Sequence, residues 1–165
     1  MMGSGKSAVG RGLAQRLSLP FVDSDREIES RAGCTVSEIF AQKGEPEFRR
    51  LEAEVIREIA LEPKIVALGG GACAQPGMME FLLERGTLIY LRADLDILIK
   101  RIGDARTRPM LQKMSPKERR ERIETLQRER ESSYSQAHIM VDTTEGPVTI
   151  VVDKVVEQLE LRARA

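Results

Sequence analysis

The segment Gly3-Ser4-Gly5-Lys6-Ser7 constrains the fold more than any other part of this sequence. It matches the second half of the pattern G-x-x-x-x-G-K-[ST], in which a glycine-rich loop surrounds the phosphates of a nucleotide. In such a loop the lysine neutralises the outer phosphates and the serine hydroxyl binds Mg²⁺. The residues after the loop carry an apolar stripe at helical spacing (Val9, Leu13 and Leu17). We therefore predict a nucleotide phosphate site formed by Gly3, Ser4, Gly5, Lys6, Ser7 and Ala8.

The amino-acid composition limits the number of domains and the kinds of partner and metal site that we expect. With 165 residues, of which 41% are hydrophobic, the chain suits one globular domain spanning 1–165. Lys and Arg together number 26, and so do Asp and Glu, so we expect neither a nucleic acid nor a membrane as partner. Cys34 and Cys73 are far apart and the chain has one histidine, so a zinc site or a disulfide framework is not expected. We expect a cytoplasmic protein with reduced thiols.

Short apolar runs alternate with helical patterns along the chain. This alternation predicts parallel strands joined by right-handed crossovers, and hence an α/β domain with helices on both faces of a sheet. The first predicted strand begins at Phe21, and the others cover 64–68, 87–91 and 139–142. The predicted helices cover 8–17 and 26–32, then one that begins at Thr35 and a longer one that begins near Pro46 and carries an apolar face to Ile59. Further helices are predicted over 77–84, 94–102, 117–137 and the residues after Pro147.

Asp23 and Asp25 follow the first predicted strand. Their spacing of i and i+2 predicts that the two carboxylates lie on the same side of an extended chain. An acidic pair at a strand end is often only solvated. Beside a phosphate loop, however, one carboxylate can hold Mg²⁺ through water while its neighbour faces an acceptor hydroxyl.

Two arginines and a glycine run are candidates for binding an acceptor. Arg49 is three residues from Glu52 on one helix, so the two can form an ion pair. Arg130 lies in line with an inward apolar stripe, and an inward arginine needs an anionic partner, which is either a structural carboxylate or a ligand. Gly69, Gly70 and Gly71 end a strand, where they form either a tight turn or a close approach to a ligand.

A charged segment around Pro109 contains Arg101, Arg106 and Arg108. Such a segment is often a solvated loop. Near a triphosphate, a loop that carries arginine can instead close over the site and stabilise charge in the transition state. We predict a lid over about 103–116, because this segment lacks a helical apolar stripe.

Taken together, these motifs resemble the shikimate kinase family of small P-loop kinases. The resemblance covers nearly the whole chain and rests on the order and spacing of six motifs: GSGKS, LPFVDSD, GE-x-x-FRR-x-E, LGGGA, TRPML and R-x-x-x-Y. It implies transfer of a phosphoryl group from ATP, with Mg²⁺, to the 3-hydroxyl of shikimate, a step toward aromatic amino acids. It also implies a three-layer fold, an acceptor-binding region over about 26–60 and a monomer.

The same resemblance assigns a role to each candidate residue. Lys6 would hold the β- and γ-phosphates, Ser7 would bind the metal, and Asp23 would bind it through water. Asp25 would bind the reacting hydroxyl and act as its base. The remaining roles are acceptor binding by Arg49, Gly69, Gly70, Gly71 and Arg130, orientation of Arg49 by Glu52, a lid contact from Arg108 and an adenine contact from Arg101. Ala8 departs from the threonine common at its position, and Glu145 departs from a basic residue found in some members.

The family sheet has five parallel strands in the order 2-3-1-4-5, and its first strand precedes the phosphate loop. No residues for that strand precede Met1 here. We therefore expect the natural protein to begin upstream, with apolar residues and a glycine before Met1. For this chain we expect four strands with a groove where the fifth belongs, or the gap filled by another segment.

Two other functional readings remain open. One is a sister P-loop kinase, such as a gluconate kinase, whose acceptor also carries a carboxylate. The other is a nucleotide-binding protein that has lost catalysis. The second would be expected to lack Lys6, Asp25 or the lid arginine, and all three are present.

Overall fold

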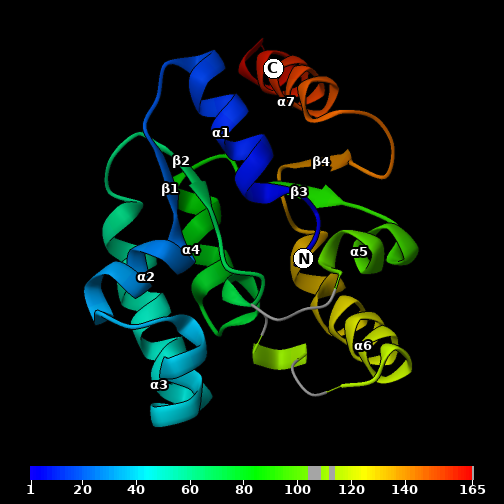
Figure 1. Ribbon diagram of the computed structural model, residues 1–165. Helices are drawn as coiled ribbons and strands as arrows, with labels where there is room; N and C mark the ends of the chain where they lie inside the picture. Colours follow the sequence, from blue (N-terminus) through cyan, green and yellow to red (C-terminus); the bar gives the residue numbers. More distant parts are fainter. Residues whose placement is uncertain (104–108, 112–113, 165) are drawn as a thin grey trace.

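In the part of the chain that the structure describes, the strands form two separate parallel pairs. The computed structural model describes residues 1–103, 109–111 and 114–164. Strand β1 (Phe21–Asp23) pairs with β2 (Ile65–Ala67), with Phe21 opposite Ile65. Strand β3 (Ile89–Arg92) pairs with β4 (Ile139–Asp142), with Ile89 opposite Ile139. The α/β class and the parallel pairing predicted from the alternating pattern are confirmed (Figure 1).

A groove separates the inner strands β2 and β3, and we call it the strand groove. Its cavity measures about 180 Å³ and is lined by both inner strands. Helix α1 (Lys6–Leu17) closes one side through Val9, Gly10 and Leu13. In the described part of the chain, each inner strand pairs with one neighbouring strand only. The expectation of four strands with a gap is thus confirmed, although they form two pairs and not one continuous sheet.

Seven α-helices and two short 3-10 helices surround the strands in the described residues. Helix α1 packs against β2 and α7, and α7 packs against β4. Helices α2 and α3 pack against each other, and α2 also contacts β1. Figure 1 shows α2 and α3 on the opposite side of the molecule from α5 and α6. Besides α1, the helices are α2 (Ser24–Ala32), α3 (Val36–Ile59), η1 (Ala72–Ala74), α4 (Met78–Arg85), α5 (Leu95–Ile102), η2 (Pro109–Leu111), α6 (Pro116–Tyr134) and α7 (Val148–Arg164).

Local sequence signals set the helix ends. Thr35 and Ser115 each form a capping box with the glutamate three residues later, which satisfies backbone N–H groups at the start of α3 and α6. Gly33 ends α2 in the left-handed conformation. Helix α3 kinks at Gly44, whose φ of 79° is not helical, and Pro46 follows at the start of the second part.

The apolar core lies in clusters on either side of the strands. Val9 and Leu13 of α1 pack with Val155 of α7 over β3 and β4. Ile28 of α2 packs with Phe48 of α3 beside β1 and β2. These clusters fix α1, which carries Lys6 of the loop, and α3, which carries Arg49.

Among the described residues, no helix is long and apolar enough to cross a bilayer.

The prediction that Asp23 and Asp25 lie on the same side of an extended chain is wrong. Strand β1 ends at Asp23, and helix α2 begins at Ser24. Asp23 caps this helix, because its Oδ1 accepts a hydrogen bond from the Asp25 backbone N–H at 3.2 Å. A capping aspartate favours the start of a helix over continued extension, so Asp25 lies in the first helical turn.

Candidate active site

The phosphate loop ends at the N-terminus of α1. Gly5 is the N-cap of this helix and has a φ of 88°, a left-handed conformation that side chains rarely adopt. The backbone N–H groups of a first helical turn have no partners within the helix, and the helix dipole is positive there. The loop therefore presents an electropositive helix end with Lys6 at its first position.

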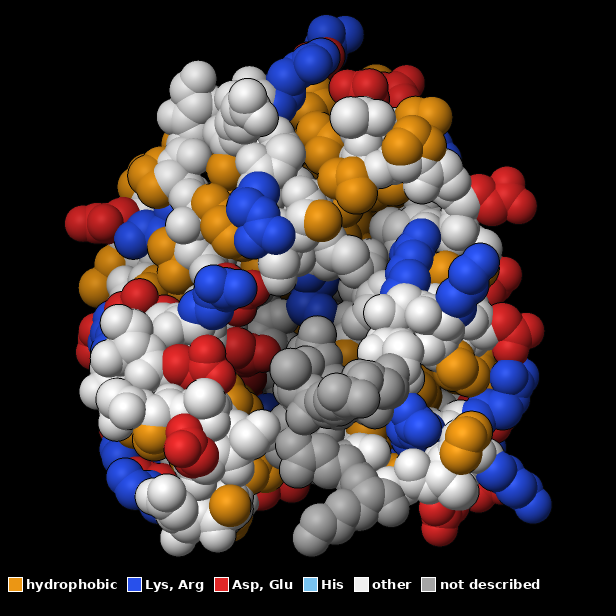
Figure 2. All heavy atoms as spheres, in the orientation of Figure 1, with side chains coloured by type: hydrophobic (Ala, Val, Ile, Leu, Met, Phe, Trp, Pro, Cys, Tyr) orange, Lys and Arg blue, Asp and Glu red, His pale blue; other side chains and the backbone are white. Residues whose placement is uncertain are grey.

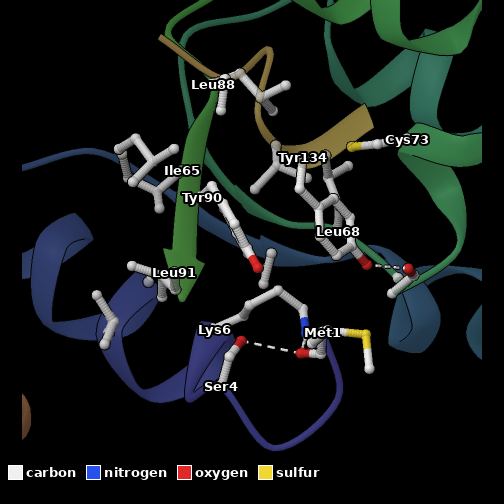
Figure 3. A pocket seen from close by; sticks show the side chains of 18 of the residues that line it. Met1, Ser4, Lys6, Ile65, Leu68, Cys73, Leu88, Tyr90, Leu91 and Tyr134 are labelled. Carbon is white, nitrogen blue, oxygen red and sulfur yellow. Dashed lines mark hydrogen bonds between the residues drawn. The ribbon is translucent and has the colours of Figure 1, made fainter. Parts of the chain in front are cut away.

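Lys6 and Ser4 meet at one backbone oxygen. The Lys6 ammonium donates to the Met1 carbonyl at 2.7 Å, and the Ser4 hydroxyl donates to the same oxygen at 2.9 Å. Figure 3 shows both side chains beside Met1 at one end of the strand groove. Ser4 is buried. The lysine is thus held over the loop, where a nucleotide phosphate would meet it.

Ser7 and Asp23 bring two hard oxygen donors together. The Ser7 hydroxyl donates to Asp23 Oδ2 at 2.6 Å, across from α1 to the end of β1. Mg²⁺ prefers oxygen ligands, and in nucleotide sites it keeps several waters and takes only one or two protein oxygens. The described residues contain no cluster of three or more His, Cys, Asp or Glu side chains that could form an all-protein metal cage. The pair therefore fits an ion that arrives with a nucleotide.

A second cavity of about 90 Å³ opens next to Lys6, and we call it the acceptor pocket. It brings together residues from the loop, from α2, from α3, from the glycine run and from α6. Figure 2 shows a hollow in this face of the molecule, with basic and acidic side chains around it. The described residues that line the pocket are Met2, Lys6, Asp25, Val36, Phe40, Phe48, Arg49, Glu52, Gly69, Gly70, Gly71, Met110 and Arg130.

Arg130 of α6 is buried in the acceptor pocket, with 6% of its surface exposed. Its Nη1 lies 3.9 Å from the Met1 sulfur, and the described residues place no carboxylate within ion-pair distance of it. Burial of an unpaired guanidinium is costly, so such an arginine normally faces an anion. Of the two interpretations of Arg130, the described contacts favour a ligand over a structural ion pair.

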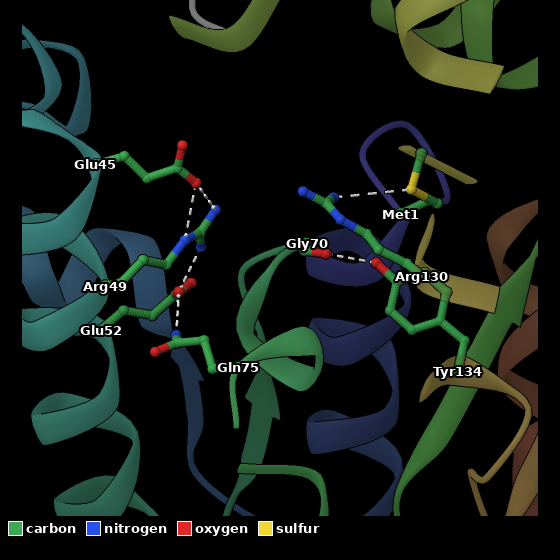
Figure 4. A network of polar contacts seen from close by, with 8 residues as sticks. All are labelled: Met1, Glu45, Arg49, Glu52, Gly70, Gln75, Arg130 and Tyr134. Carbon is green, nitrogen blue, oxygen red and sulfur yellow. Dashed lines mark hydrogen bonds and ion pairs between the residues drawn. The ribbon is translucent and has the colours of Figure 1, made fainter. Parts of the chain in front are cut away.

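Arg49 faces Arg130 from the other side of the glycine run (Figure 4). The predicted ion pair with Glu52 is present, with Arg49 Nη1 donating to Glu52 Oε2 at 2.6 Å. Arg49 also donates through Nη2 to Glu45 at 2.9 Å, and half of the Glu45 side chain is exposed. Burial raises the pKa of the Glu52 carboxyl, and Arg49 acts in the opposite direction. The guanidinium groups of Arg49 and Arg130 extend toward one another across the pocket.

The glycine run allows side chains to approach the backbone closely. A Cβ at Gly69 would lie 2.3 Å from Glu52 Oε1, and a Cβ at Gly71 would lie 2.6 Å from the Arg49 guanidinium. Neither position could hold a larger residue without displacing these groups. The Gly70 carbonyl accepts a hydrogen bond from the Tyr134 hydroxyl at 2.5 Å. The run is therefore a close approach to a polar site as well as a turn.

The predicted lid and adenine contacts are only partly described. Arg106 and Arg108 lie outside the described residues. Arg101 is described, and its Nη2 donates to the Thr143 carbonyl at 2.6 Å. The Thr143 hydroxyl in turn lies within hydrogen-bond distance of two carbonyl oxygens, that of Arg92 at 3.0 Å and that of Ser4 at 3.3 Å. Arg101 is thus linked to the phosphate loop through Thr143.

Two polar residues of this region were missed by sequence reasoning. Thr143 follows β4, and its hydroxyl links the loop to β3. Gln75 follows η1, and its side-chain amide donates to Glu52 Oε2 at 2.7 Å. Neither belongs to a recognisable motif, and each lies far along the chain from its partners. The sequence gives no signal for either contact.

Comparison with known proteins points to one family. The family model described as shikimate kinase matches residues 2–160. A shikimate kinase of Paracidovorax citrulli is 44% identical over 96% of this chain and 88% of the relative. The structure of shikimate kinase from Acinetobacter baumannii in complex with shikimate is 34% identical, with a TM-score of 0.90 over 98% of this chain and 89% of that one. The shikimate kinase of Aquifex aeolicus is 35% identical, with a TM-score of 0.84 over 99% and 94%.

Proposed function

The chain belongs to the shikimate kinase family, and we propose that it transfers the γ-phosphoryl group of ATP to the 3-hydroxyl of shikimate, giving shikimate 3-phosphate and ADP. The observation that carries this proposal is the acceptor pocket. Arg130 is buried there without a carboxylate partner among the described residues, and it faces Arg49 beside Lys6 and Asp25. An acceptor with a carboxylate at one end and a hydroxyl at the other fits this arrangement.

On the nucleotide side, Lys6 neutralises the β- and γ-phosphates at the N-terminus of α1. Gly3, Ser4, Gly5 and Ala8 line the same loop. Phosphoryl transfer is catalysed mainly by positioning and by charge stabilisation, so Lys6 is the residue on which the rate depends most. We assign to Arg101 the contact with adenine and to Arg108 the stabilisation of charge on the phosphates.

On the acceptor side, Arg49 and Arg130 bind the carboxylate of shikimate, and Gly69, Gly70 and Gly71 let it approach the backbone. Asp25 accepts the proton of the reacting hydroxyl as the oxygen attacks phosphorus. The proximity of Asp25 to Lys6 in the pocket supports this role, because the donor phosphate and the acceptor hydroxyl must meet between them.

Ser7 and Asp23 hold Mg²⁺, which neutralises charge on the phosphates when it is bound. The 2.6 Å hydrogen bond between the two side chains supports a shared position for them at the metal. We also propose that the enzyme acts as a monomer in the cytoplasm, where ATP is available.

A coupled assay of ADP release tests the function. With ATP and Mg²⁺, shikimate should support turnover and gluconate should not. Turnover with gluconate alone would assign the chain to a sister kinase activity. If neither acceptor supports ATP turnover and the protein still binds nucleotide, the hypothesis of a nucleotide-binding protein that has lost catalysis would be supported.

A further inference from the structure

Glu52 is a fully buried carboxylate in which one oxygen receives two donors. Arg49 Nη1 donates to Oε2 at 2.6 Å, and Gln75 Nε2 donates to the same oxygen at 2.7 Å. The other oxygen, Oε1, faces Gly69 and has no hydrogen-bond partner among the described residues. Figure 4 shows Gln75 on the opposite side of Glu52 from Arg49. A buried carboxylate depends on its donors, and here Gln75 supplies the only one besides Arg49 in the described contacts.

The backbone holds Gln75 firmly in this position. Its N–H donates to the Ala72 carbonyl at 3.1 Å, and its carbonyl accepts from the Met78 N–H at 3.1 Å. It directly follows η1, where the chain turns away from the glycine run. The amide therefore reaches Glu52 from a short connection that is fixed at both ends.

Arg49 is paired with two carboxylates, Glu45 and Glu52, so the direction of its guanidinium depends on the orientation of Glu52. Its Nε and Nη2 donate to the half-exposed Glu45, and only Nη1 donates to Glu52. If Glu52 were to rotate or take up a proton, the guanidinium would lose its buried partner and would pair with the half-exposed Glu45 alone. The Gln75 donor opposes both changes, because it stabilises the ionised carboxylate in one orientation.

We propose that Gln75 is a positioning residue for the acceptor: through Glu52, it holds the Arg49 guanidinium in the direction that binds the acceptor carboxylate. This inference rests on the proposed function, since it concerns the same pocket. Gln75 does not line that pocket, so its effect reaches the acceptor through Glu52 and Arg49.

Steady-state kinetics of Gln75→Met tests the proposal, because methionine keeps the length of the side chain and removes the donor. The KM for shikimate should rise about three- to tenfold, as expected for the loss of one hydrogen bond to a charged group, while kcat and the KM for ATP stay within twofold. Gln75→Glu has nearly the same shape but sets a second carboxyl against Glu52, so its KM for shikimate should rise further. Gln158→Met, on the exposed side of α7, is the matched control and should match the wild type.

Arg49→Ala separates this proposal from the function on which it rests. If Arg49→Ala leaves the KM for shikimate unchanged, the assignment of the acceptor pocket is wrong. If Arg49→Ala raises that KM and Gln75→Met does not, only the role of Gln75 is wrong. A lower melting temperature of Gln75→Met with an unchanged KM would show a merely structural contact and would also overturn it.

Discussion

The acceptor pocket and the strand groove adjoin one another, and Lys6, Gly69 and Gly70 line both, yet they are held by different interactions. Directional polar contacts hold the pocket, including the Arg49–Glu52 ion pair and the hydrogen bond from Tyr134 to Gly70. The groove has mainly apolar walls, and among the described residues each of its two inner strands, β2 and β3, pairs on one side only. The contrast indicates that the pocket determines what binds, whereas the groove limits how firmly the loop is supported.

The largest effect is expected where the two regions meet, at Lys6. Lys6→Met should lower kcat about 10²- to 10³-fold, because the ammonium stabilises charge that develops in the transition state. Lys154→Met, on the exposed surface of α7, is the control and should keep the wild-type rate. A coupled assay measures both, and an unchanged kcat for Lys6→Met would rule out the mechanism.

Filling the strand groove should stabilise the protein. We consider a version with about six apolar, β-branched residues and a glycine added before Met1, so that a strand can lie between β2 and β3. Burial of a large apolar side chain stabilises by about 1.5–3 kcal/mol, so three such side chains should raise the melting temperature by about 10 °C or more.

An extension of equal length built from Gly and Ser is the control for the added strand. It offers the same backbone but no apolar side chains. Calorimetry of the two versions compares them directly. Equal melting temperatures would show that the groove is not a weak point of the fold.

The smallest effect concerns the two tyrosines, Tyr90 and Tyr134, which line the strand groove. Burial raises the pKa of Tyr90 and of Tyr134 to about 12, and Glu131 adds to the shift at Tyr90. These are the only tyrosines and the chain has no tryptophan, so ultraviolet absorbance reports them cleanly. The folded protein should titrate near pH 12, and the denatured chain near 10.

This shift also predicts how stability depends on pH. Because the folded pKa values lie above the unfolded ones, the neutral tyrosines contribute stability that is complete below about pH 10 and is lost as the pH rises through about 12. A titration midpoint near pH 10 in the folded protein would show that burial does not raise the pKa of either tyrosine hydroxyl.

Periodicity and turn residues made most of the fold predictable. The capping box at Thr35 and the break at Gly33 appear where their local chemistry puts them, because such signals act within a few residues. Asp25 shows the limit of this reasoning. Its pattern is compatible with a strand and with a helix start, and the cap formed by Asp23 decided in favour of the helix.

Long-range polar contacts limit how much of the candidate site could be predicted from the sequence. The chain motifs indicated Arg49 and Arg130 as acceptor-binding candidates, and the fold brings both to one pocket. The contact between Gln75 and Glu52 joins residues 23 positions apart, and that between Thr143 and Ser4 joins residues 139 apart. Such pairs depend on tertiary packing, so no local pattern encodes them.

Isothermal titration of shikimate into wild type and Arg130→Ala tests the central claim, that the acceptor pocket binds a carboxylate between two arginines. The wild type should bind one shikimate per chain. Arg130→Ala should bind it at least tenfold more weakly, since a charge-assisted hydrogen bond contributes about 1.5–3 kcal/mol, while ATP binding stays near normal. Arg128→Ala, an exposed neighbour on α6, should match the wild type. Unchanged shikimate affinity in Arg130→Ala, or weakened binding of ATP instead, would contradict the account.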